Sequence, residues 1–250
     1  MVYEEYGDPK NPTVIFLHGA MAYKSFMRQR PLCGSFHLVF YTLPGHASDS
    51  RRDFDREVAA EEIARLVHIL GKDKVHLVGF SLGSQLALMV ADRHPEMLES
   101  VVLVSPLIDS TAADRAMLFF STRLVGFLTK FGPTCRLVAR IIGMSGEEYE
   151  KFRREQKSQR VGRLSSRILA GMLKSSDLKN IGALRSRALI LAGENEAPSF
   201  LRSAKKLSGL LKNSSLLIYE GAKHNIPYKF HGRFNGDLKL FLEDGGQGLH

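Results

Sequence analysis

The pentapeptide Gly-Phe-Ser-Leu-Gly at 79–83 constrains the fold of this chain more than any other segment. Residues 74–78 resemble a short strand with β-branched valines at 75 and 78, and residues 84–92 carry apolar side chains at helical spacing. The pattern predicts a strand and a helix that meet in a sharp turn at Ser81. Such a turn holds the serine in a strained backbone conformation and lifts its hydroxyl clear of the sheet, as in a nucleophile elbow.

The two glycines of the pentapeptide fit the same interpretation. Side chains at 79 and 83 would collide with the neighbouring strand and helix, so glycine is expected at both positions. A helix over 82–93 would begin at the serine, with its free amides and positive dipole end beside any developing oxyanion. A plain strand–helix turn with a capping serine is the alternative, and the flanking pattern favours the catalytic interpretation.

Length and composition indicate an ordinary globular protein. The chain has 250 residues, enough for one large α/β domain with an insertion, and 44% of them are hydrophobic. Glu4 and Glu5 argue against a secretory leader, and no apolar run reaches the ~18 residues of a membrane span. Cys33 and Cys135 lack metal-ligand spacing, which favours reduced thiols in a cytoplasmic protein. The net charge of +9 comes without a nucleic-acid motif, so we interpret it as a solvated surface.

Short apolar runs alternate with helical patterns along most of the chain. Strands are expected at Val2–Tyr6, Thr13–Leu17, His37–Thr42, Lys74–Gly79, Val101–Val104, Ala188–Ala192 and Ser215–Tyr219. An amphipathic helix is expected over Asp55–Leu70, with Val58 and Ile63 on its apolar side. Because the strands are continuous apolar runs, they favour a parallel sheet that is covered on both faces.

This alternation stops between Asp109 and Arg187. Helical segments are expected there instead, near 112–131, 133–143, 146–160 and 162–174, separated by glycines. We therefore expect a helical cap at 109–182 inserted into a core made of 1–108 and 183–244. The glycine-rich tail, 245–250, is expected to be disordered.

Four sequence blocks together resemble the α/β-hydrolase superfamily, in particular its small capped serine esterases. They are Phe-Leu-His-Gly-Ala at 16–20, Leu-Pro-Gly-His at 43–46, the elbow, and Gly-Glu-Asn-Glu at 193–196 with Gly-Ala-Lys-His at 221–224. The resemblance covers nearly the whole chain and implies an α/β fold with a mostly parallel sheet of about seven strands, flanking helices and an inserted helical cap. The chain departs from the pattern at Glu196, where most relatives carry Asp, and at Lys223, where Gly is common. It also lacks the first strand of the usual opening hairpin.

The resemblance implies a catalytic triad in the order serine, acid, histidine. His224 follows the last expected strand and is the candidate base, which takes the proton of Ser81 and returns it to the leaving group. Glu196 follows the preceding strand and is the candidate acid, which fixes the tautomer of the histidine. Asp109 is a second candidate acid because it follows an earlier strand, and Glu194 is a third.

The oxyanion hole needs two backbone donors. The N–H groups of Leu82 and Ala20 are the candidates, with Met21 lining the pocket beside them and His18 bracing the loop. The segment 116–131 is strongly apolar, and we expect Phe120, Leu124 and Phe127 to contact substrate. Leu43–His46 is expected to be a structural loop.

The segment 151–167 is basic, with seven cations and one acid. Arg153, Lys157, Arg160 and Arg167 are expected near one helical face. The stripe could attract a substrate with an anionic group beside an acyl portion, or an anionic membrane surface, and a solvated face is the alternative.

Serine at the elbow argues against epoxide opening and carbon–halogen cleavage, because relatives with those activities use Asp there. The chain has neither a phosphate-binding glycine loop nor a His-Glu-x-x-His motif, so no cofactor and no metal are expected. The first hypothesis is a hydrolase of carboxylic esters or thioesters that acts on a small molecule through an acyl-enzyme. The alternatives are a carbon–carbon hydrolase or lyase acting on a metabolic intermediate, and a non-catalytic ligand-binding member of the fold.

Overall fold

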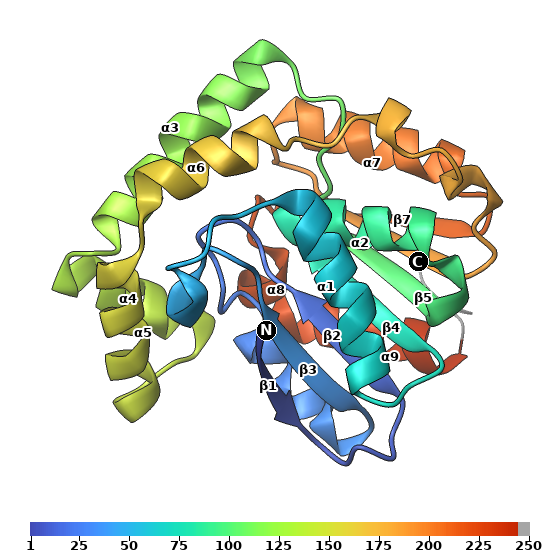
Figure 1. Ribbon diagram of the computed structural model, residues 1–250, viewed down its shortest axis with the longest axis horizontal. Coiled ribbons are helices and arrows are strands. Elements are labelled where there is room, and N and C mark those ends of the chain that lie inside the picture. The colour runs from blue at the N-terminus through green and yellow to red at the C-terminus, as the bar shows by residue number, and fades with distance from the viewer. Residues whose placement is uncertain (245–250) are drawn as a thin grey trace.

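The computed structural model describes residues 1–244 and contains a seven-stranded sheet of order β1-β3-β2-β4-β5-β6-β7 (Figure 1). The strands are β1 Val2–Tyr6, β2 Thr13–Leu17, β3 His37–Thr42, β4 Val75–Phe80, β5 Leu98–Val104, β6 Arg187–Gly193 and β7 Ser214–Tyr219. β1 pairs with β3 in antiparallel fashion, and the remaining described pairs are parallel. The predicted fold class and its mostly parallel sheet are confirmed. The tail, 245–250, lies outside the described residues.

Both faces of the sheet are buried, as the continuous apolar runs predicted. Successive residues of β2 alternate between two core clusters, with Ile15 and Leu17 in one and Val14 and Phe16 in the other. Helices α1 (Arg56–Ile69), α2 (Leu82–Arg93) and α7 (Pro198–Leu210) contribute to the first cluster. Helix α9 (His231–Asp244) and a 3₁₀ segment (Met27–Gly34) contribute to the second.

Helix α1 begins where the sequence indicates and buries Ile63, Leu66 and Val67 as expected, but not Val58. The Asp55 carboxylate accepts the N–H groups of Glu57 and Val58, at 2.9 and 3.1 Å, which caps the first turn. Val58, expected on the apolar side, is exposed, whereas Ile63 is fully buried. At 3.6 residues per turn, a residue five positions before Ile63 lies on the opposite side of the helix.

Four helices lie between β5 and β6: α3 (Ala112–Leu128), α4 (Gly132–Ile142), α5 (Gly146–Ser158) and α6 (Val161–Ala170). Figure 1 shows α3 and α6 side by side, outside the layers that cover the sheet. The basic stripe predicted for one helical face is divided between two helices, because the chain breaks between α5 and α6. Arg153 pairs with Glu150 on α5, and Arg167 pairs with Asp53, so these cations do not share one helical face.

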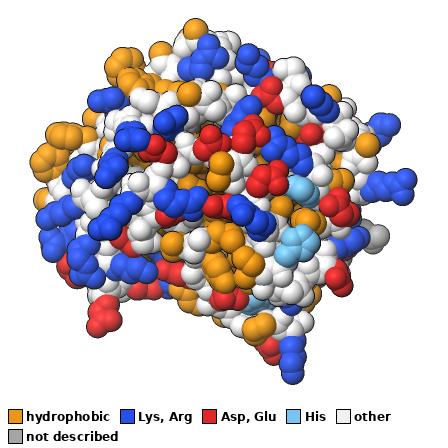
Figure 2. Space-filling view, in the orientation of Figure 1, with side chains coloured by type: hydrophobic (Ala, Val, Ile, Leu, Met, Phe, Trp, Pro, Cys, Tyr) orange, Lys and Arg blue, Asp and Glu red, His pale blue; other side chains and the backbone are white. Residues whose placement is uncertain are grey.

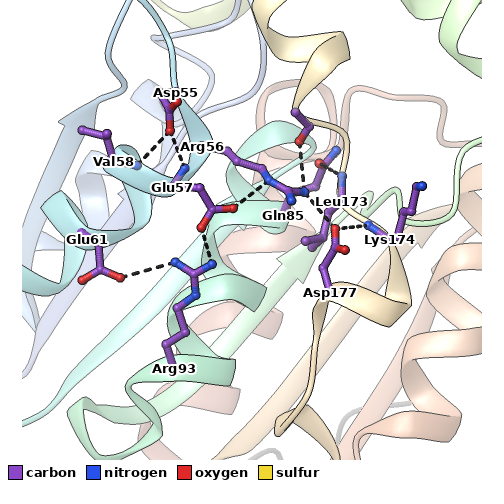
Figure 3. Close-up of polar contacts among 11 residues, drawn as sticks. Asp55, Arg56, Glu57, Val58, Glu61, Gln85, Arg93, Leu173, Lys174 and Asp177 are labelled. Carbon is purple, nitrogen blue, oxygen red and sulfur yellow. Dashed lines mark hydrogen bonds and ion pairs between the residues drawn. The ribbon is translucent and has the colours of Figure 1, made fainter.

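The chain that returns from α6 is fastened to α1 and α2 (Figure 3). Arg56 Nη1 donates to the Gly171 carbonyl at 3.4 Å and to Asp177 Oδ2 at 3.1 Å. Gln85 Oε1 accepts the Leu173 N–H at 3.0 Å. These contacts hold the end of the inserted segment beside α2, the helix that starts at Ser81.

Residues 1–244 contain neither a candidate membrane-spanning helix nor a candidate metal site. No helix in this range combines the length and apolarity required to cross a membrane. No group of three or more His, Cys, Asp or Glu side chains in this range is arranged to hold a metal ion.

Candidate active site

Ser81 lies in a strained turn between β4 and α2, with φ 53° and ψ −109°. Its N–H donates to the Val104 carbonyl on β5 at 2.9 Å. The Ser84 hydroxyl lies 2.7 Å from the Gly79 carbonyl oxygen and 2.9 Å from that of Val104. The predicted strand–turn–helix at Ser81 is confirmed, and Ser84 is a brace for it that sequence analysis did not identify.

Neighbouring backbone atoms leave no room for a side chain at either glycine of the pentapeptide. A Cβ atom on Gly79 would lie 2.4 Å from the Gly83 carbonyl oxygen. A Cβ atom on Gly83 would lie 1.9 Å from the carbonyl oxygen of Leu17 at the end of β2. The expected collisions with the neighbouring helix and strand are therefore present.

Two buried histidines shape the loop that follows β2. His18 Nε2 accepts the Leu43 N–H at 3.0 Å, and His18 Nδ1 lies 2.8 Å from the Gly19 carbonyl oxygen. His46 Nε2 accepts the N–H of Met21, a residue with φ 56°, at 3.4 Å. His18 braces the loop as expected. His46 has a second bracing role, since the 43–46 turn is a structural support for the loop.

Burial keeps both imidazoles neutral. Desolvation lowers the pKa of His18 well below its ordinary value, helped by His46, whose ring centroid lies 4.8 Å away. Desolvation also lowers the pKa of His46 to about 4. A neutral ring is what the geometry needs, because each Nε2 accepts a backbone N–H.

We expect the fold to lose stability as the pH falls from about 6.5 to about 4. In the unfolded chain a histidine binds its proton near pH 6.5, whereas folded His46 stays neutral down to about 4, so acid favours the unfolded state. Once the pH lies below both pKa values, one such histidine lowers the free energy of unfolding by roughly 3 kcal/mol. Urea unfolding between pH 4.5 and 7.5 should give a flatter pH dependence for His46→Gln than for wild type. His68→Gln, at an exposed site on α1, is the control, and equal slopes for all three proteins would contradict the assignment.

The loops after β6 and β7 bring Glu196 and His224 together. Glu196 Oε1 lies 2.8 Å from His224 Nδ1, and Glu196 Oε2 accepts the Gly193 N–H at 3.2 Å. The Glu196 side chain is fully buried, while that of His224 is 37% exposed. The carboxylate is therefore shielded from water, and the imidazole stays accessible.

Gly193 allows these two loops to approach. A Cβ atom there would lie 2.5 Å from the Ala222 carbonyl oxygen, and that oxygen accepts the Asn195 N–H at 2.8 Å. Glu194 Oε2 accepts the N–H of Gly221 at 2.9 Å. Glu194 thus supports the loop that carries His224, and among residues 1–244 it makes no hydrogen bond to the imidazole.

Asp109, the other candidate acid, is engaged elsewhere. Its Oδ2 lies 2.6 Å from Lys206 Nζ, and its Oδ1 accepts the Ser175 N–H at 2.8 Å. Both partners belong to the chain that follows the inserted helices. Asp109 therefore holds this segment and makes no contact with His224 in the described part of the chain.

The ring of His224 packs against Phe80, a residue of the elbow. Its ring centroid is 4.8 Å from that of Phe80, the residue before Ser81, and 4.6 Å from that of Phe200. No hydrogen bond joins Ser81 and His224 among the contacts of residues 1–244. The structure thus pairs Glu196 with His224 and packs Phe80, the residue before Ser81, against the His224 ring.

A cavity of about 30 Å³ opens at Ser81 between the core and the inserted helices. Its walls are Ala20, Ser81, Leu82, Gln85, Leu107, Leu118, Thr122, Ser165, Ile168, Leu169 and Met172. Ala20 and Leu82, the candidate oxyanion donors, therefore lie beside Ser81. Met21 lines a different cavity of about 200 Å³, together with Val125, Ile141, Phe152 and Tyr228.

Phe120, Leu124 and Phe127, which were expected to contact substrate, lie at the surface of this structure. Their exposed fractions are 70%, 57% and 57%, and none of them lines either cavity. Leu118 and Thr122 of α3 line the cavity at Ser81 instead. Helix α3 is apolar on several sides, so its composition does not reveal which side faces inward.

Comparisons with known proteins identify the fold family of the chain. The model of a family described as alpha/beta hydrolase fold matches residues 12–137. The chain belongs to the α/β-hydrolase fold family. Its match includes the elbow, the loop after β2 and the beginning of the inserted helices.

Individual relatives of this α/β-hydrolase are named as ester hydrolases. A monoacylglycerol lipase, abhd6-B of Xenopus laevis, is 33% identical over 112 residues, 42% of this chain and 33% of the lipase. A pimeloyl-[acyl-carrier protein] methyl ester esterase of Nitrosospira multiformis is 32% identical over 103 residues, 38% of this chain and 39% of the esterase. The chain thus spans about a third of the length of the curated relatives it matches.

Solved structures share the fold over nearly the whole chain. A thermophilic esterase from Thermogutta terrifontis has a TM-score of 0.73 at 21% identity, covering 98% of this chain and 94% of the esterase. At this level of identity the similarity establishes the α/β-hydrolase fold.

Proposed function

We propose that this α/β-hydrolase cleaves carboxylic esters or thioesters through an acyl-enzyme on Ser81, with His224 as base and Glu196 as its acid partner. The observation that carries the proposal is the 2.8 Å contact between a fully buried Glu196 and an accessible His224 whose ring packs on Phe80, the residue before the strained Ser81. A buried carboxylate paired with an exposed imidazole is the arrangement that holds a general base in one tautomer. The lipase and esterase names of the relatives support the same reaction class.

In the proposed mechanism each ring nitrogen of His224 has its own role. Because Nδ1 of His224 faces Glu196, Nδ1 carries the proton of the neutral ring and Nε2 is the base. As Ser81 Oγ attacks the ester carbonyl carbon, its proton passes to Nε2, and Glu196 stabilises the imidazolium. The imidazolium then protonates the departing alcohol or thiol. A water molecule, deprotonated by the same nitrogen, releases the acid and frees Ser81.

The oxyanion would lie between the β2 loop and the start of α2. Leu82 is the first residue of α2, so its N–H belongs to the turn whose amides have no intrahelical partner. Ala20 lines the same cavity, and we propose its N–H as the second donor. The hydrogen bond from Met21 to His46 fixes the backbone next to Ala20.

We propose that residues 109–182 act as a cap over this site. Helices α3 and α6 provide Leu118, Thr122 and Ser165 to the walls of the cavity at Ser81. The cavity lined by Met21 is largely apolar, so we propose that it receives the acyl portion of a small-molecule ester.

Covalent labelling tests this proposal. A fluorophosphonate probe should modify Ser81, identified by mass spectrometry of the tryptic peptide, and a series of p-nitrophenyl esters should be turned over with a preference for one acyl length. Ser121→Ala, at an exposed site on α3, should label like wild type. A protein that neither reacts nor hydrolyses esters would be a non-catalytic member of the fold. Cleavage of a β-diketone without ester hydrolysis would indicate a carbon–carbon hydrolase.

A further inference from the structure

An exposed apolar stripe runs along one side of α3 and the turn after it. It consists of Met117, Phe120, Leu124, Phe127, Leu128 and Phe131, with exposed fractions between 39% and 70%. Most of them are three or four positions apart, so they project from the same side of the helix. Soluble proteins rarely leave so many large apolar side chains together in water unless the surface binds something.

Helix α4 extends this α3 stripe. Leu137 is 58% exposed and Ile141 is 41% exposed. Ile141 shares the rim of one cavity with Val125 of α3, which places the two helices next to one another. Figure 2 shows hydrophobic side chains gathered along the upper left edge of the molecule, over α3, with Lys and Arg side chains beside them.

The segment that carries the α3 stripe is basic, and acids flank it at Asp114 and Glu147. Residues 115–146 contain Arg115, Arg123, Lys130, Arg136 and Arg140 and no Asp or Glu. None of these cations takes part in an ion pair among the described residues. Arg123 stacks over the Phe119 ring at 5.0 Å, which leaves its charge beside the stripe.

We propose that this surface docks on an anionic lipid membrane, with the α3 stripe among the acyl chains and the flanking cations at the headgroups. An apolar helix face bordered by Lys and Arg is the pattern of helices that lie in the membrane interface. Two copies of this surface facing each other would bring cations of like charge together, so charge complementarity favours an anionic surface over a second copy. Helix α3 has 17 residues and lies on the membrane without crossing it.

The same helix connects the docking surface to the candidate active site. Leu118 and Thr122 line the cavity at Ser81 from the inner side of α3, while Phe120 and Leu124 face outward. The membrane surface would therefore lie one helix diameter from the site. Docking itself does not depend on turnover, so it can be tested whether or not the protein hydrolyses esters.

Vesicle flotation tests the proposal on the full chain. Wild type should partition onto phosphatidylcholine vesicles that contain phosphatidylserine, bind pure phosphatidylcholine more weakly, and lose binding as salt is raised. The double variants Phe120→Ser/Phe127→Ser and Arg123→Glu/Lys130→Glu should each reduce partitioning about tenfold or more. Circular dichroism should show that both variants remain folded.

Two single variants at other exposed sites serve as controls for apolar area and for charge. Ile69→Ser removes a side chain that is 58% exposed on α1, and Lys205→Glu reverses an exposed charge on α7. Both should bind vesicles like wild type. Absence of wild-type binding, or equal binding by all variants, would overturn the proposal. So would a dimer in sedimentation velocity that Phe120→Ser/Phe127→Ser dissociates, since the stripe would then contact a second copy.

Discussion

Replacing Ser81 with alanine is expected to lower kcat for a p-nitrophenyl ester by about 10³-fold or more. The substitution removes the nucleophile but keeps the N–H that donates to Val104 and the glycines that permit the turn. The protein should therefore stay folded, with an unfolding midpoint close to that of wild type. Steady-state kinetics and thermal unfolding measured on the same preparation separate the two effects.

A second serine variant, Ser84→Ala, is expected to lower the stability of the fold, in contrast to Ser81→Ala. Ser84→Ala removes the hydroxyl that lies 2.7 Å from the Gly79 carbonyl oxygen, leaving a buried acceptor with one partner fewer. We expect a loss of about 1–3 kcal/mol in unfolding free energy for that variant. Near-wild-type ester hydrolysis by Ser81→Ala would contradict the nucleophile assignment.

The fold could be predicted because its signals are local. The turn at Ser81 is predicted by two glycines and by the strand and helix patterns on either side of them. A Cβ atom added to either glycine would lie within 2.4 Å of a backbone oxygen. The continuous apolar runs of β2 and β4 specify a sheet buried on both faces. Glu196 and His224 could be paired because adjacent parallel strands end at the same edge of the sheet.

The inserted helices could not be predicted to the same depth. Their number and approximate bounds follow from glycine positions, but the inward side of α3 depends on packing against α6. Phe120 was therefore expected in the pocket and lies at the surface, 70% exposed. The role of His46 depends on a contact with Met21, 25 positions away, that no local pattern encodes.

Glu196→Gln is expected to lower kcat on the order of 10³–10⁴-fold, whereas Asp109→Asn should leave it within about threefold of wild type. The glutamine can still accept the Gly193 N–H, but it loses the charge that stabilises the imidazolium, and its amide can present an N–H to Nδ1 and favour the wrong tautomer. Asp109→Asn only weakens a partly exposed pairing with Lys206, worth less than about 1 kcal/mol of stability.

Glu196→Asp distinguishes the loss of the carboxylate from a change in shape. The shorter acid keeps the charge at the same loop position, so it should recover part of the activity that Glu196→Gln loses, while a merely structural Glu196 would give two equally damaged variants. The measurements are kcat and KM for one p-nitrophenyl ester, with thermal unfolding of each protein. If Asp109→Asn proves the more damaging substitution, the acid of the triad follows β5 and the carboxylate paired with His224 serves only to position the loop.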